Sequence, residues 1–585
     1  MRRGDRSAAK PTQTAGPAAG DRDAGTTETS AGRAVTTYAQ ATTVGDVLVR
    51  AAGTWPDQEA LIFPDYTATY AELLAEATRV ARGLRALGVR RGSHVGIYMK
   101  NCPEFVHVLF GAALLGAVVV PLNARYRRHD LGYVIGHSDL TVLVVRSVPG
   151  DPVDCLEVVR GALPELGAAP DPLRLAVAGA PRLRAVVQLD PDSDAGSGIV
   201  SAARFAELAA SESEQAVWRD RAAVRVRDTA AMPYTSGTTA RPKGCRLSHE
   251  ALTRKAAAVA ERYQVGPGDR FWNPLPLFHL SALGPLLSVL GCGGAYLSMP
   301  HFEADQAWRM LTAHLVTHIY PTFPAVVQDL LHHPAYDPAA LPRLRMASGS
   351  LPQDMFAWTQ ERLPAGAVLV STYGMTETAG LFCISELDAP LDRRAVTNGR
   401  PLDGVQVRIV DPETGAVLPA GRRGLIEVTG YCLFDGYHRD PEATAAAFTS
   451  DGWFRTEDMG QVDADGRLTY LGRARDMLRV GGENVSPLEI EAFLNTHPSV
   501  KLAQVVGRAD PKYGEVPVAF VEPLPGAVLE PEELIRFCQG QLASFKIPRD
   551  VHLVTEWPMS ATKIIKAELR RRARESAAST LGDGR

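Results

Sequence analysis

Short apolar strands that alternate with amphipathic helices constrain the fold of this chain more than any other feature. Continuous runs rich in Val, Ile and Leu occupy residues 95–99, 117–121, 141–145 and 185–189, and helical patterns separate them. Strands without polar alternation are buried on both faces, as in mostly parallel sheets that helices cover. The sequence therefore predicts an α/β fold with a large N-terminal region of stacked, mostly parallel sheets.

One helix carries a complete set of start and stop signals. Thr69 is followed three residues later by Glu72, which is the capping-box pattern of a helix start. Apolar residues then recur at helical spacing from Leu73 to Leu87, and Gly88 is typical of a helix end. We therefore expect a helix between Thr69 and Gly88.

Changes in composition mark the domain limits. Residues 1–36 hold hardly any large apolar side chain, so they cannot bury enough surface to offset the entropy of ordering. Residues 468–471 form the last expected strand before a joint, and helices at 487–494 and 531–542 follow in a compact α+β pattern. The expected divisions are a disordered tail at 1–36, a large domain at 37–474, a small mobile domain at 475–570 and a flexible tail at 571–585.

Charge and cysteine content limit the classes of partner and compartment. The 585 residues include 62 basic and 66 acidic ones, and this net charge of −4 gives no support to a nucleic acid partner. The seven cysteines form no Cys-x-x-Cys pair, which disfavours a zinc cage and a disulfide framework and favours a cytoplasmic setting. No membrane span is expected, because the longest apolar stretch, 105–120, is shorter than the roughly 20 residues of a spanning helix.

A loop dense in hydroxyls at residues 234–244 reads Tyr-Thr-Ser-Gly-Thr-Thr-Ala-Arg-Pro-Lys-Gly. Gly237 allows successive backbone N–H groups to converge on an anion, and Lys243 supplies a cation. In a P-loop the lysine follows glycine and precedes Ser or Thr, whereas Lys243 lies between Pro242 and Gly244. The pattern therefore predicts a phosphate-binding loop of another kind. Its side-chain donors are Thr235, Ser236, Thr238 and Thr239.

This loop closely resembles the signature loop of the adenylate-forming superfamily, which includes acyl-CoA synthetases, aryl-CoA ligases, peptide-synthetase adenylation domains and firefly-type luciferases. Further segments that resemble family motifs follow in the family's order, and the likeness covers about residues 40–570. The resemblance implies a distorted β-barrel beside the parallel sheets. It also makes Thr238 and Lys243 catalytic residues at the phosphates of ATP.

Residues 371–377, Ser-Thr-Tyr-Gly-Met-Thr-Glu, resemble the family segment that holds adenine and the metal. The resemblance implies that Tyr373 packs against adenine, that Thr372 and Thr376 lie along the nucleotide, and that Glu377 is a catalytic Mg²⁺ ligand. One carboxylate together with phosphate oxygens is a ligand set that Mg²⁺ favours.

Residues 453–458, Trp-Phe-Arg-Thr-Glu-Asp, resemble the segment whose aspartate binds the ribose hydroxyls. By this resemblance Asp458 binds ribose and Arg473 joins it. The chain departs from the family at Glu457, where relatives usually have glycine. This extra carboxylate lies close to an anionic nucleotide unless its side chain points to the surface.

Two segments resemble the small C-terminal domain of the family. Arg475 falls at the hinge about which that domain turns, Arg479 follows it, and Gly481 with Gly482 matches the loop that lines the pantetheine tunnel. Residues 558–564 resemble the motif of the catalytic lysine, although the glycine that usually precedes the lysine is missing. Lys563 takes this role in our alignment, and Lys566 is the alternative.

The acyl pocket has weaker markers. His279 ends a Pro-Leu-Phe-His segment where acyl- and aryl-CoA ligases carry an aromatic residue or histidine beside the carboxylate, but a structural histidine is an alternative. Peptide-synthetase adenylation domains place an aspartate there, so an α-amino acid substrate is disfavoured. Gly349 and Ser350 stand where relatives have a glycine-rich adenine loop, which implies nucleotide contacts.

The resemblance implies an AMP-forming acyl-CoA ligase with ATP, Mg²⁺ and coenzyme A as cofactors. Its substrate is a small-molecule carboxylic acid, of medium, branched or aromatic type, and its assembly is a monomer or homodimer. Three alternatives stay open. In the first, the acceptor of the activated acid is a carrier protein. In the second, the acceptor is an amine, and the activated acid can be as small as nitrite. In the third, the chain is a nucleotide-binding relative without catalysis.

Overall fold

The computed structural model describes residues 42–147, 153–191, 195–235, 241–351, 353–480, 483–510, 513–539, 541–560 and 563–582. Side chains are not described for residues 354, 475, 483, 484, 560, 563 and 577–582. The tail expected at 1–36 lies outside the described residues.

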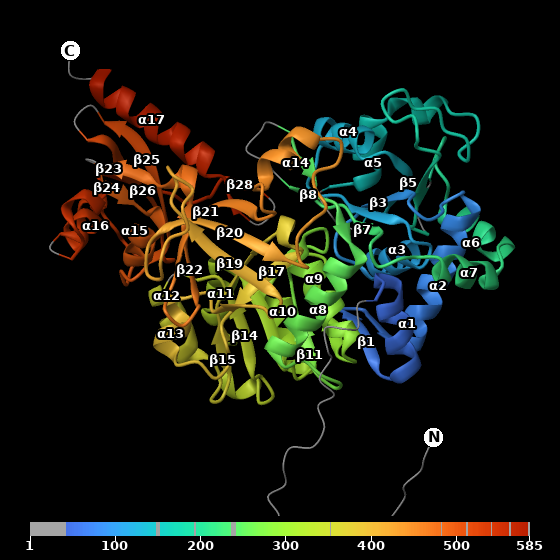
Figure 1. The fold of residues 1–585 in the computed structure, drawn as a ribbon, viewed down its shortest axis with the longest axis horizontal. Helices are drawn as coiled ribbons and strands as arrows, with labels where there is room; N and C mark the ends of the chain where they lie inside the picture. Colours follow the sequence, from blue (N-terminus) through green and yellow to red (C-terminus); the bar gives the residue numbers. More distant parts are fainter. Residues whose placement is uncertain are drawn as a thin grey trace, which may run out of the picture. The chain divides into compact units, whose positions relative to one another are not determined.

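Two large sheets form the N-terminal region, as the apolar strands predicted (Figure 1). One has the strand order β15-β14-β13-β11-β12-β1-β2 and is parallel except for β2. Its strands are β1 (Glu59–Phe63), β2 (Tyr66–Thr69), β11 (Arg270–Trp272), β12 (Ala295–Leu297), β13 (His318–Thr322), β14 (Met346–Gly349) and β15 (Val368–Val370). The predicted α/β class is therefore confirmed.

The second large sheet has the order β10-β7-β4-β3-β5-β6 and is parallel except for β10. Its strands are β3 (His94–Tyr98), β4 (Val118–Pro121), β5 (Leu140–Val145), β6 (Ala185–Gln188), β7 (Thr229–Ala231) and β10 (Leu247–Ser248). All residues of β4 and β6 are buried, which explains the unbroken apolar runs that marked them in the sequence.

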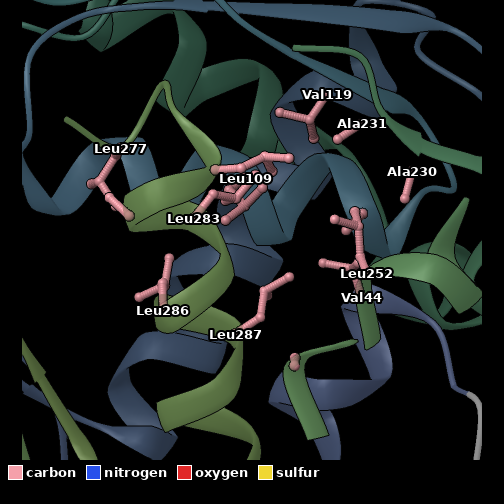
Figure 2. Packing of buried hydrophobic residues seen from close by; sticks show 14 of the residues in the cluster. Val44, Leu109, Val119, Ala230, Ala231, Leu252, Leu277, Leu283, Leu286 and Leu287 are labelled. Atoms are coloured by element: carbon pink, nitrogen blue, oxygen red, sulfur yellow. The ribbon is translucent and has the colours of Figure 1, made fainter. Parts of the chain in front are cut away.

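Helices α8 (His249–Tyr263) and α9 (Leu280–Gly291) pack against each other between these two sheets (Figure 1). Helix α8 contacts β7 of one sheet, and α9 contacts β12 of the other. Figure 2 shows the apolar core at this place, with Leu252 from α8 and Leu283 from α9 among its residues. This central layer fixes the distance between the sheets and carries residues toward the antiparallel strands described below.

The predicted capping box at Thr69 is confirmed. The Thr69 Oγ1 accepts a hydrogen bond from the Glu72 N–H at 3.2 Å, and Glu72 Oε2 accepts one from the Thr69 N–H at 2.8 Å. Helix α2 then runs over Tyr70–Ala86, and Gly88 has a φ of 85°. The remaining helices of the N-terminal region are α1 (Val44–Thr54), α3 (Pro103–Leu114), α4 (Arg128–His137), α5 (Cys155–Ala162), α6 (Ala202–Ser211), α7 (Glu214–Ala222), α10 (Ala304–Ala313), α11 (Pro324–Leu331), α12 (Gln353–Arg362), α13 (Leu391–Val396) and α14 (Pro441–Ala447).

Antiparallel strands follow the parallel sheets, where the resemblance implied a distorted barrel. They form a three-stranded sheet, β16-β17-β18, and a four-stranded sheet, β19-β20-β21-β22. Their bounds are β16 (Thr372–Met375), β17 (Gly380–Ile384), β18 (Arg400–Pro401), β19 (Val405–Val410), β20 (Gly424–Gly430), β21 (Phe454–Val462) and β22 (Leu468–Arg473). A further short hairpin pairs β8 (Tyr234–Thr235) with β9 (Lys243–Gly244).

The C-terminal region is an α+β unit with its own apolar clusters. Its elements are β23 (Leu478–Val480), β24 (Glu483–Val485), α15 (Pro487–Leu494), β25 (Val500–Asp510), β26 (Gly514–Pro523), α16 (Pro531–Cys538), β27 (Asp550–Leu553), β28 (Met559–Ser560), β29 (Lys563–Ile564) and α17 (Lys566–Gly582). Helix α16 ends at Cys538, four residues before its predicted end.

Residues from 571, expected as a flexible tail, continue helix α17 as far as Gly582. Leu569 and Ala573 lie one turn apart and are both fully buried against Val518 and Phe520 of β26. Only the first five residues of this helix, 566–570, belong to the domain as it was divided from sequence, and the apolar contact carries the helix past that limit. None of the helices in the described parts of the chain combines the length and apolarity needed to cross a bilayer.

Candidate active site

The predicted adenine-loop residues meet β16 beside the carboxyl ends of parallel strands. Gly349 is the last residue of β14, and the Ser350 N–H donates to the Thr322 carbonyl at the end of β13 at 3.0 Å. The Ser350 hydroxyl donates to the Thr372 carbonyl at 3.2 Å. Ligands of α/β proteins bind outside the carboxyl ends of such strands, so this edge is the first place to expect a site.

A buried aspartate is the centre of one side-chain cluster, which we call the aspartate cluster: Tyr373, Asp458, Tyr470 and Arg473. Asp458 is 2% exposed, and its Oδ2 accepts a 2.5 Å hydrogen bond from the Tyr373 hydroxyl. Arg473 Nε lies 3.0 Å from Asp458 Oδ1. The Tyr373 and Tyr470 rings stack with centroids 5.0 Å apart. The structure thus brings together three predicted residues and adds Tyr470, which sequence reasoning missed.

Electrostatics keep Tyr373 and Arg473 of the aspartate cluster protonated. Burial raises the pKa of the Tyr373 hydroxyl well above its usual value, and the neighbouring Asp458 charge raises it further. Burial alone would lower the pKa of Arg473, but the Asp458 carboxylate together with Tyr470, Tyr373 and Glu377 outweighs the effect of burial, and the net shift is upward. Tyr373 therefore remains a donor and Arg473 a cation, and both point at the Asp458 carboxylate.

Glu457 differs from its neighbour Asp458 in both exposure and backbone conformation. Its φ is 60°, in the left-handed region, and the β20–β21 register shifts between Leu425 and Glu427 at this point. The Glu457 side chain is exposed, whereas Asp458 is buried. The family's usual glycine is explained by the left-handed backbone, which glycine adopts without a steric cost. The departure at Glu457 therefore affects the backbone, and the added carboxylate points to the surface.

A second cluster, the glutamate cluster, consists of Lys243, Glu377 and Tyr437. Glu377 lies in the short helical turn Thr376–Thr378 that follows β16, and its Oε1 accepts a 3.0 Å hydrogen bond from the Tyr437 hydroxyl. Lys243 Nζ lies 5.0 Å from the centre of the Tyr437 ring. Two predicted catalytic residues therefore meet at one aromatic ring. Tyr437 escaped sequence reasoning because it follows Glu377 by 60 residues with no local pattern.

Cys245 lies beside the glutamate cluster and is fully buried. Its backbone forms a bridge with Tyr437, and its Sγ lies 4.0 Å from the Thr235 hydroxyl. Burial raises the pKa of the Cys245 thiol well above its usual value, and the Glu377 charge adds to the shift. A protonated thiol is a poor nucleophile, so Cys245 acts here as a small buried side chain.

The base of the predicted phosphate loop is a fixed hairpin. Thr235 pairs directly with Lys243 across β8 and β9. The Tyr234 hydroxyl lies 2.7 Å from His137 Nδ1, and the His438 N–H donates to the Gly244 carbonyl at 2.8 Å. The loop tip, which contains Ser236, Gly237, Thr238 and Thr239, lies outside the described residues.

The remaining predicted residues are placed less completely. His279 precedes α9, with its ring 4.7 Å from that of Phe278. Arg479 lies exposed on β23. For Arg475 and Lys563 the backbone alone is described, in the turn Ala474–Asp476 and in β29, and Gly481 and Gly482 lie outside the described residues.

Lys566, the alternative to Lys563, is engaged in an ion pair of the C-terminal region. Its Nζ lies 2.6 Å from Glu491 Oε1, and the Glu491 side chain is 3% exposed. Removing one partner of a buried ion pair leaves an uncompensated charge, which is costly, so this pair favours a structural role for Lys566.

The described residues contain no group of three or more His, Cys, Asp or Glu side chains that could hold a metal ion. Glu377 is a single carboxylate close to Lys243 and the phosphate-loop hairpin. This fits a Mg²⁺ ion that takes one protein carboxylate and completes its shell with phosphate oxygens and water, and it does not fit an all-protein metal cage.

Comparison with known proteins agrees with this arrangement. A family model described as AMP-binding enzyme matches residues 48–438, and one described as AMP-binding enzyme C-terminal domain matches 489–563. The putative acyl-CoA synthetase YngI of Bacillus subtilis is 33% identical, over 91% of this chain and 97% of its own length.

Solved structures agree as well. ATP-bound MatB from Rhodopseudomonas palustris is 30% identical with a TM-score of 0.76, over 91% of this chain and 99% of that one. The anthranilate CoA ligase AuaEII in complex with anthranoyl-AMP is 26% identical with a TM-score of 0.80, over 92% and 98%. The resemblance inferred from the motifs is confirmed. The chain belongs to the AMP-binding enzyme family and is a homologue of AMP-forming acid–CoA ligases.

Proposed function

We propose that this protein activates a carboxylic acid with ATP, releasing pyrophosphate, and then transfers the acyl group to the thiol of coenzyme A. The observation that carries the proposal is the pairing of two clusters near one sheet edge. The aspartate cluster offers a carboxylate to vicinal hydroxyls, and the glutamate cluster offers a carboxylate and a lysine beside a phosphate-loop hairpin. These are the groups that a nucleoside triphosphate requires.

In the first step an oxygen of the substrate carboxylate attacks the α-phosphorus. The bond from that phosphorus to the bridging oxygen breaks, and pyrophosphate leaves as acyl-AMP forms. Mg²⁺ held at Glu377 would supply charge compensation for the phosphates when bound. Lys243 and the N–H and hydroxyl donors of the loop, Thr238 among them, bind the same oxygens, so negative charge that moves to pyrophosphate is stabilised in place.

The adenosine part of the nucleotide is held by the aspartate cluster. Asp458 accepts hydrogen bonds from the ribose hydroxyls, and Arg473 orients that carboxylate. Tyr373 is fixed by the stacked Tyr470 ring and by the Phe382 ring, each 5.0 Å away, and it supplies the aromatic side chain that packs against adenine. Gly349, Ser350, Thr372 and Thr376 border the same nucleotide.

The second step requires movement of the C-terminal region. Lys563 steadies the acyl oxygens during adenylation, and the domain at 475–570 then turns about Arg475 relative to the domain at 37–474. After the turn, Arg479, Gly481 and Gly482 lie along the path of the pantetheine thiol. The thiol sulfur attacks the acyl carbon, and the bond from that carbon to the AMP oxygen breaks.

The substrate is a small-molecule carboxylic acid, and an apolar or aromatic acid is favoured. His279 at the start of α9 lies next to Phe278, so the acyl end offers an aromatic wall with one polar tip. A relative that binds anthranoyl-AMP supports an aromatic acid. All seven cysteines are free thiols, which supports a reducing compartment such as the cytoplasm.

Pyrophosphate release from Mg·ATP tests the proposal directly. The full chain is assayed against fatty, branched, benzoic and cinnamic acids, each with and without coenzyme A. Release that depends on one acid class and accelerates with coenzyme A is the expected result. Release that is indifferent to coenzyme A would point to a carrier protein or an amine as acceptor. No release with any acid would overturn the assignment.

A further inference from the structure

A lysine occupies a buried position on helix α8. Leu252, Ala256 and Val259 form the apolar stripe of this helix, and Lys255 lies on the same stripe with 2% of its surface exposed. The i, i+3, i+4, i+7 spacing of that stripe would ordinarily hold an aliphatic side chain. The chemistry of Lys255 therefore needs an explanation beyond packing.

The Lys255 ammonium binds the turn that follows Glu377. Its Nζ donates to the Thr378 carbonyl at 2.8 Å and also to the Leu381 carbonyl. Between these two residues the backbone is left-handed twice, with a φ of 52° at Ala379 and 100° at Gly380. The unusual turn directs both carbonyls toward one point, and the ammonium neutralises their mutual repulsion.

Burial of the Lys255 ammonium costs hydration free energy, which its hydrogen bonds must offset. Burial lowers the pKa of Lys255 to about 8, against the opposing effect of Cys432 and Cys383. Both recorded hydrogen bonds go to neutral carbonyl oxygens. A buried charge is expensive unless its hydrogen bonds compensate for lost hydration, so the two carbonyls must be fixed for the lysine to remain charged.

Glu377 is held from the opposite side by the segment before α14. The Phe434 N–H donates to the Glu377 carbonyl at 2.9 Å, and the Tyr437 hydroxyl donates to its carboxylate at 3.0 Å. Lys255 fixes the chain one residue after Glu377, and Phe434 fixes Glu377 itself. The position of the carboxylate therefore depends on α8 as well as on the 434–437 segment.

We propose that Lys255 is a positioning residue for the proposed metal ligand: it ties the turn after Glu377 to helix α8 and so aims the Glu377 carboxylate at the Mg²⁺ of bound ATP. The inference rests on the proposed function, because it requires Glu377 to hold that ion. Lys255 does not touch the nucleotide in this account, and its effect passes through the Thr378 carbonyl.

The same helix supplies a matched control. Arg262, seven residues further along α8, donates from Nη1 to the Ile384 carbonyl at 2.5 Å. Arg262 therefore ties the C-terminal end of β17 to α8 by the same kind of contact. The residue that it binds, Ile384, lies seven positions after Glu377 in the sequence. Lys255→Met removes the ties to Thr378 and Leu381 near the start of β17. Arg262→Met removes the tie to Ile384 at its end, together with longer contacts to the carbonyls of Arg400 and Pro401.

The experiment measures Mg²⁺-dependent ATP binding to the full chain by calorimetry, together with pyrophosphate release and thermal unfolding. Lys255→Met should raise the half-saturating Mg²⁺ concentration by about 10-fold to 100-fold, the range typical of residues that orient a metal ligand. Its kcat at saturating Mg²⁺ should fall much less. Arg262→Met should leave the half-saturating Mg²⁺ concentration unchanged even where it lowers the unfolding temperature.

Each outcome has one meaning. If both variants behave alike, Lys255 has no particular link to Glu377 and the inference is overturned. Lys255→Gln, which keeps a neutral donor at this position, replaces Lys255→Met if the latter does not fold. If neither variant folds, Lys255 is a stability element and the inference is again overturned. Wild-type protein without Mg²⁺-dependent ATP binding would instead overturn the proposed function.

Discussion

The two clusters of the site differ in how completely the protein itself satisfies them. In the aspartate cluster, Asp458 is buried and binds Tyr373 and Arg473 within 3.0 Å. In the glutamate cluster, Glu377 binds one hydroxyl, and Lys243 rests 5.0 Å from a ring centre. The first is therefore assembled before ligand binding, whereas the second leaves its charged groups available to phosphates and a metal ion.

This difference assigns different kinetic roles to the clusters. A preassembled cluster contributes equally to ground-state and transition-state binding, so its loss should appear mainly in the KM for ATP. Groups that meet the charge that develops on pyrophosphate act in the transition state, so their loss should appear mainly in kcat. Four predictions test this division, starting with the largest expected effect.

Glu377→Gln should lower kcat for pyrophosphate release by about 10²–10³-fold, because the metal contribution to charge stabilisation amounts to several kcal/mol. The amide keeps the shape and can still accept from the Tyr437 hydroxyl, but it is a much weaker Mg²⁺ ligand. Acid-dependent pyrophosphate release at several Mg²⁺ concentrations measures the effect. Asp435→Asn is a control in the neighbouring segment, and a change below threefold in Glu377→Gln would break the comparison.

Asp458→Asn should act in the other cluster by raising the KM for ATP about 10-fold to 100-fold, since hydrogen bonds to a charged group contribute about 1.5–3 kcal/mol. The substitution removes the ionised acceptor and leaves the Arg473 cation without its carboxylate. Initial rates over a range of ATP concentrations separate KM from kcat. A loss confined to kcat would show that the aspartate cluster also acts in the transition state.

A pH dependence should distinguish the clusters next. The His137 ring contacts the Tyr234 hydroxyl of the phosphate-loop hairpin at 2.7 Å, and the His438 ring lies 5.6 Å from the His137 ring, whereas His438 reaches Gly244 only through its backbone N–H. Burial lowers the pKa of both imidazoles, helped by Arg439 at His137 and by His94 at His438. Their pKa values in the folded protein lie below the ordinary value of about 6.5, so protonation of either imidazole opposes the native arrangement. The stability that the neutral imidazoles contribute is fully present above about pH 6.5 and is lost as the pH falls through their folded pKa values.

Acidification should therefore weaken the phosphate-loop hairpin before it affects the aspartate cluster, whose pKa shifts keep Tyr373 and Arg473 protonated throughout this range. The KM for ATP should rise as the pH falls below about 6.5, while binding of adenosine, which lacks phosphates, should change little. Titrating both ligands by calorimetry between neutral and mildly acidic pH measures the contrast. Equal weakening of ATP and adenosine would contradict the proposed origin.

The parts of the fold and of the site that depend on local sequence patterns could be predicted. Unbroken apolar runs indicated the strands at 117–121 and 141–145. The capping box at Thr69 was predictable because it requires only two residues three positions apart. The segments around Glu377 and Asp458 were found because their residue types and order resemble family motifs. These features share one property, namely that their interactions or their motifs are confined to a few consecutive residues.

What escaped prediction depended on contacts between distant segments. Tyr437 reaches Glu377 across 60 residues, and Lys255 reaches Thr378 across 123. No spacing rule links such pairs, because the sheets and helices between them decide which side chains meet. The extent of α17 was missed for a related reason, since Leu569 and Ala573 are the only buried apolar side chains among residues 566–576, the part of this helix whose side chains are described.

The smallest predicted effect concerns Glu457, where a substitution should change the stability of the protein and leave its kinetics nearly unchanged. At its left-handed φ of 60° the backbone of Glu457 is strained by the side chain, and glycine has no side chain to cause that strain. Glu457→Gly should therefore increase the free energy of unfolding by about 1 kcal/mol. The Glu457 carboxylate is exposed, and its charge is the last of the causes that raise the pKa of the Tyr437 hydroxyl, so kcat and the KM for ATP should change little. Urea denaturation and initial rates measure the two quantities, with Glu457→Ala as a control that removes the charge and keeps the strain. If Glu457→Ala lowers the KM for ATP as much as Glu457→Gly does, the Glu457 charge does reach the nucleotide, and the division between a surface-facing Glu457 and a buried Asp458 fails.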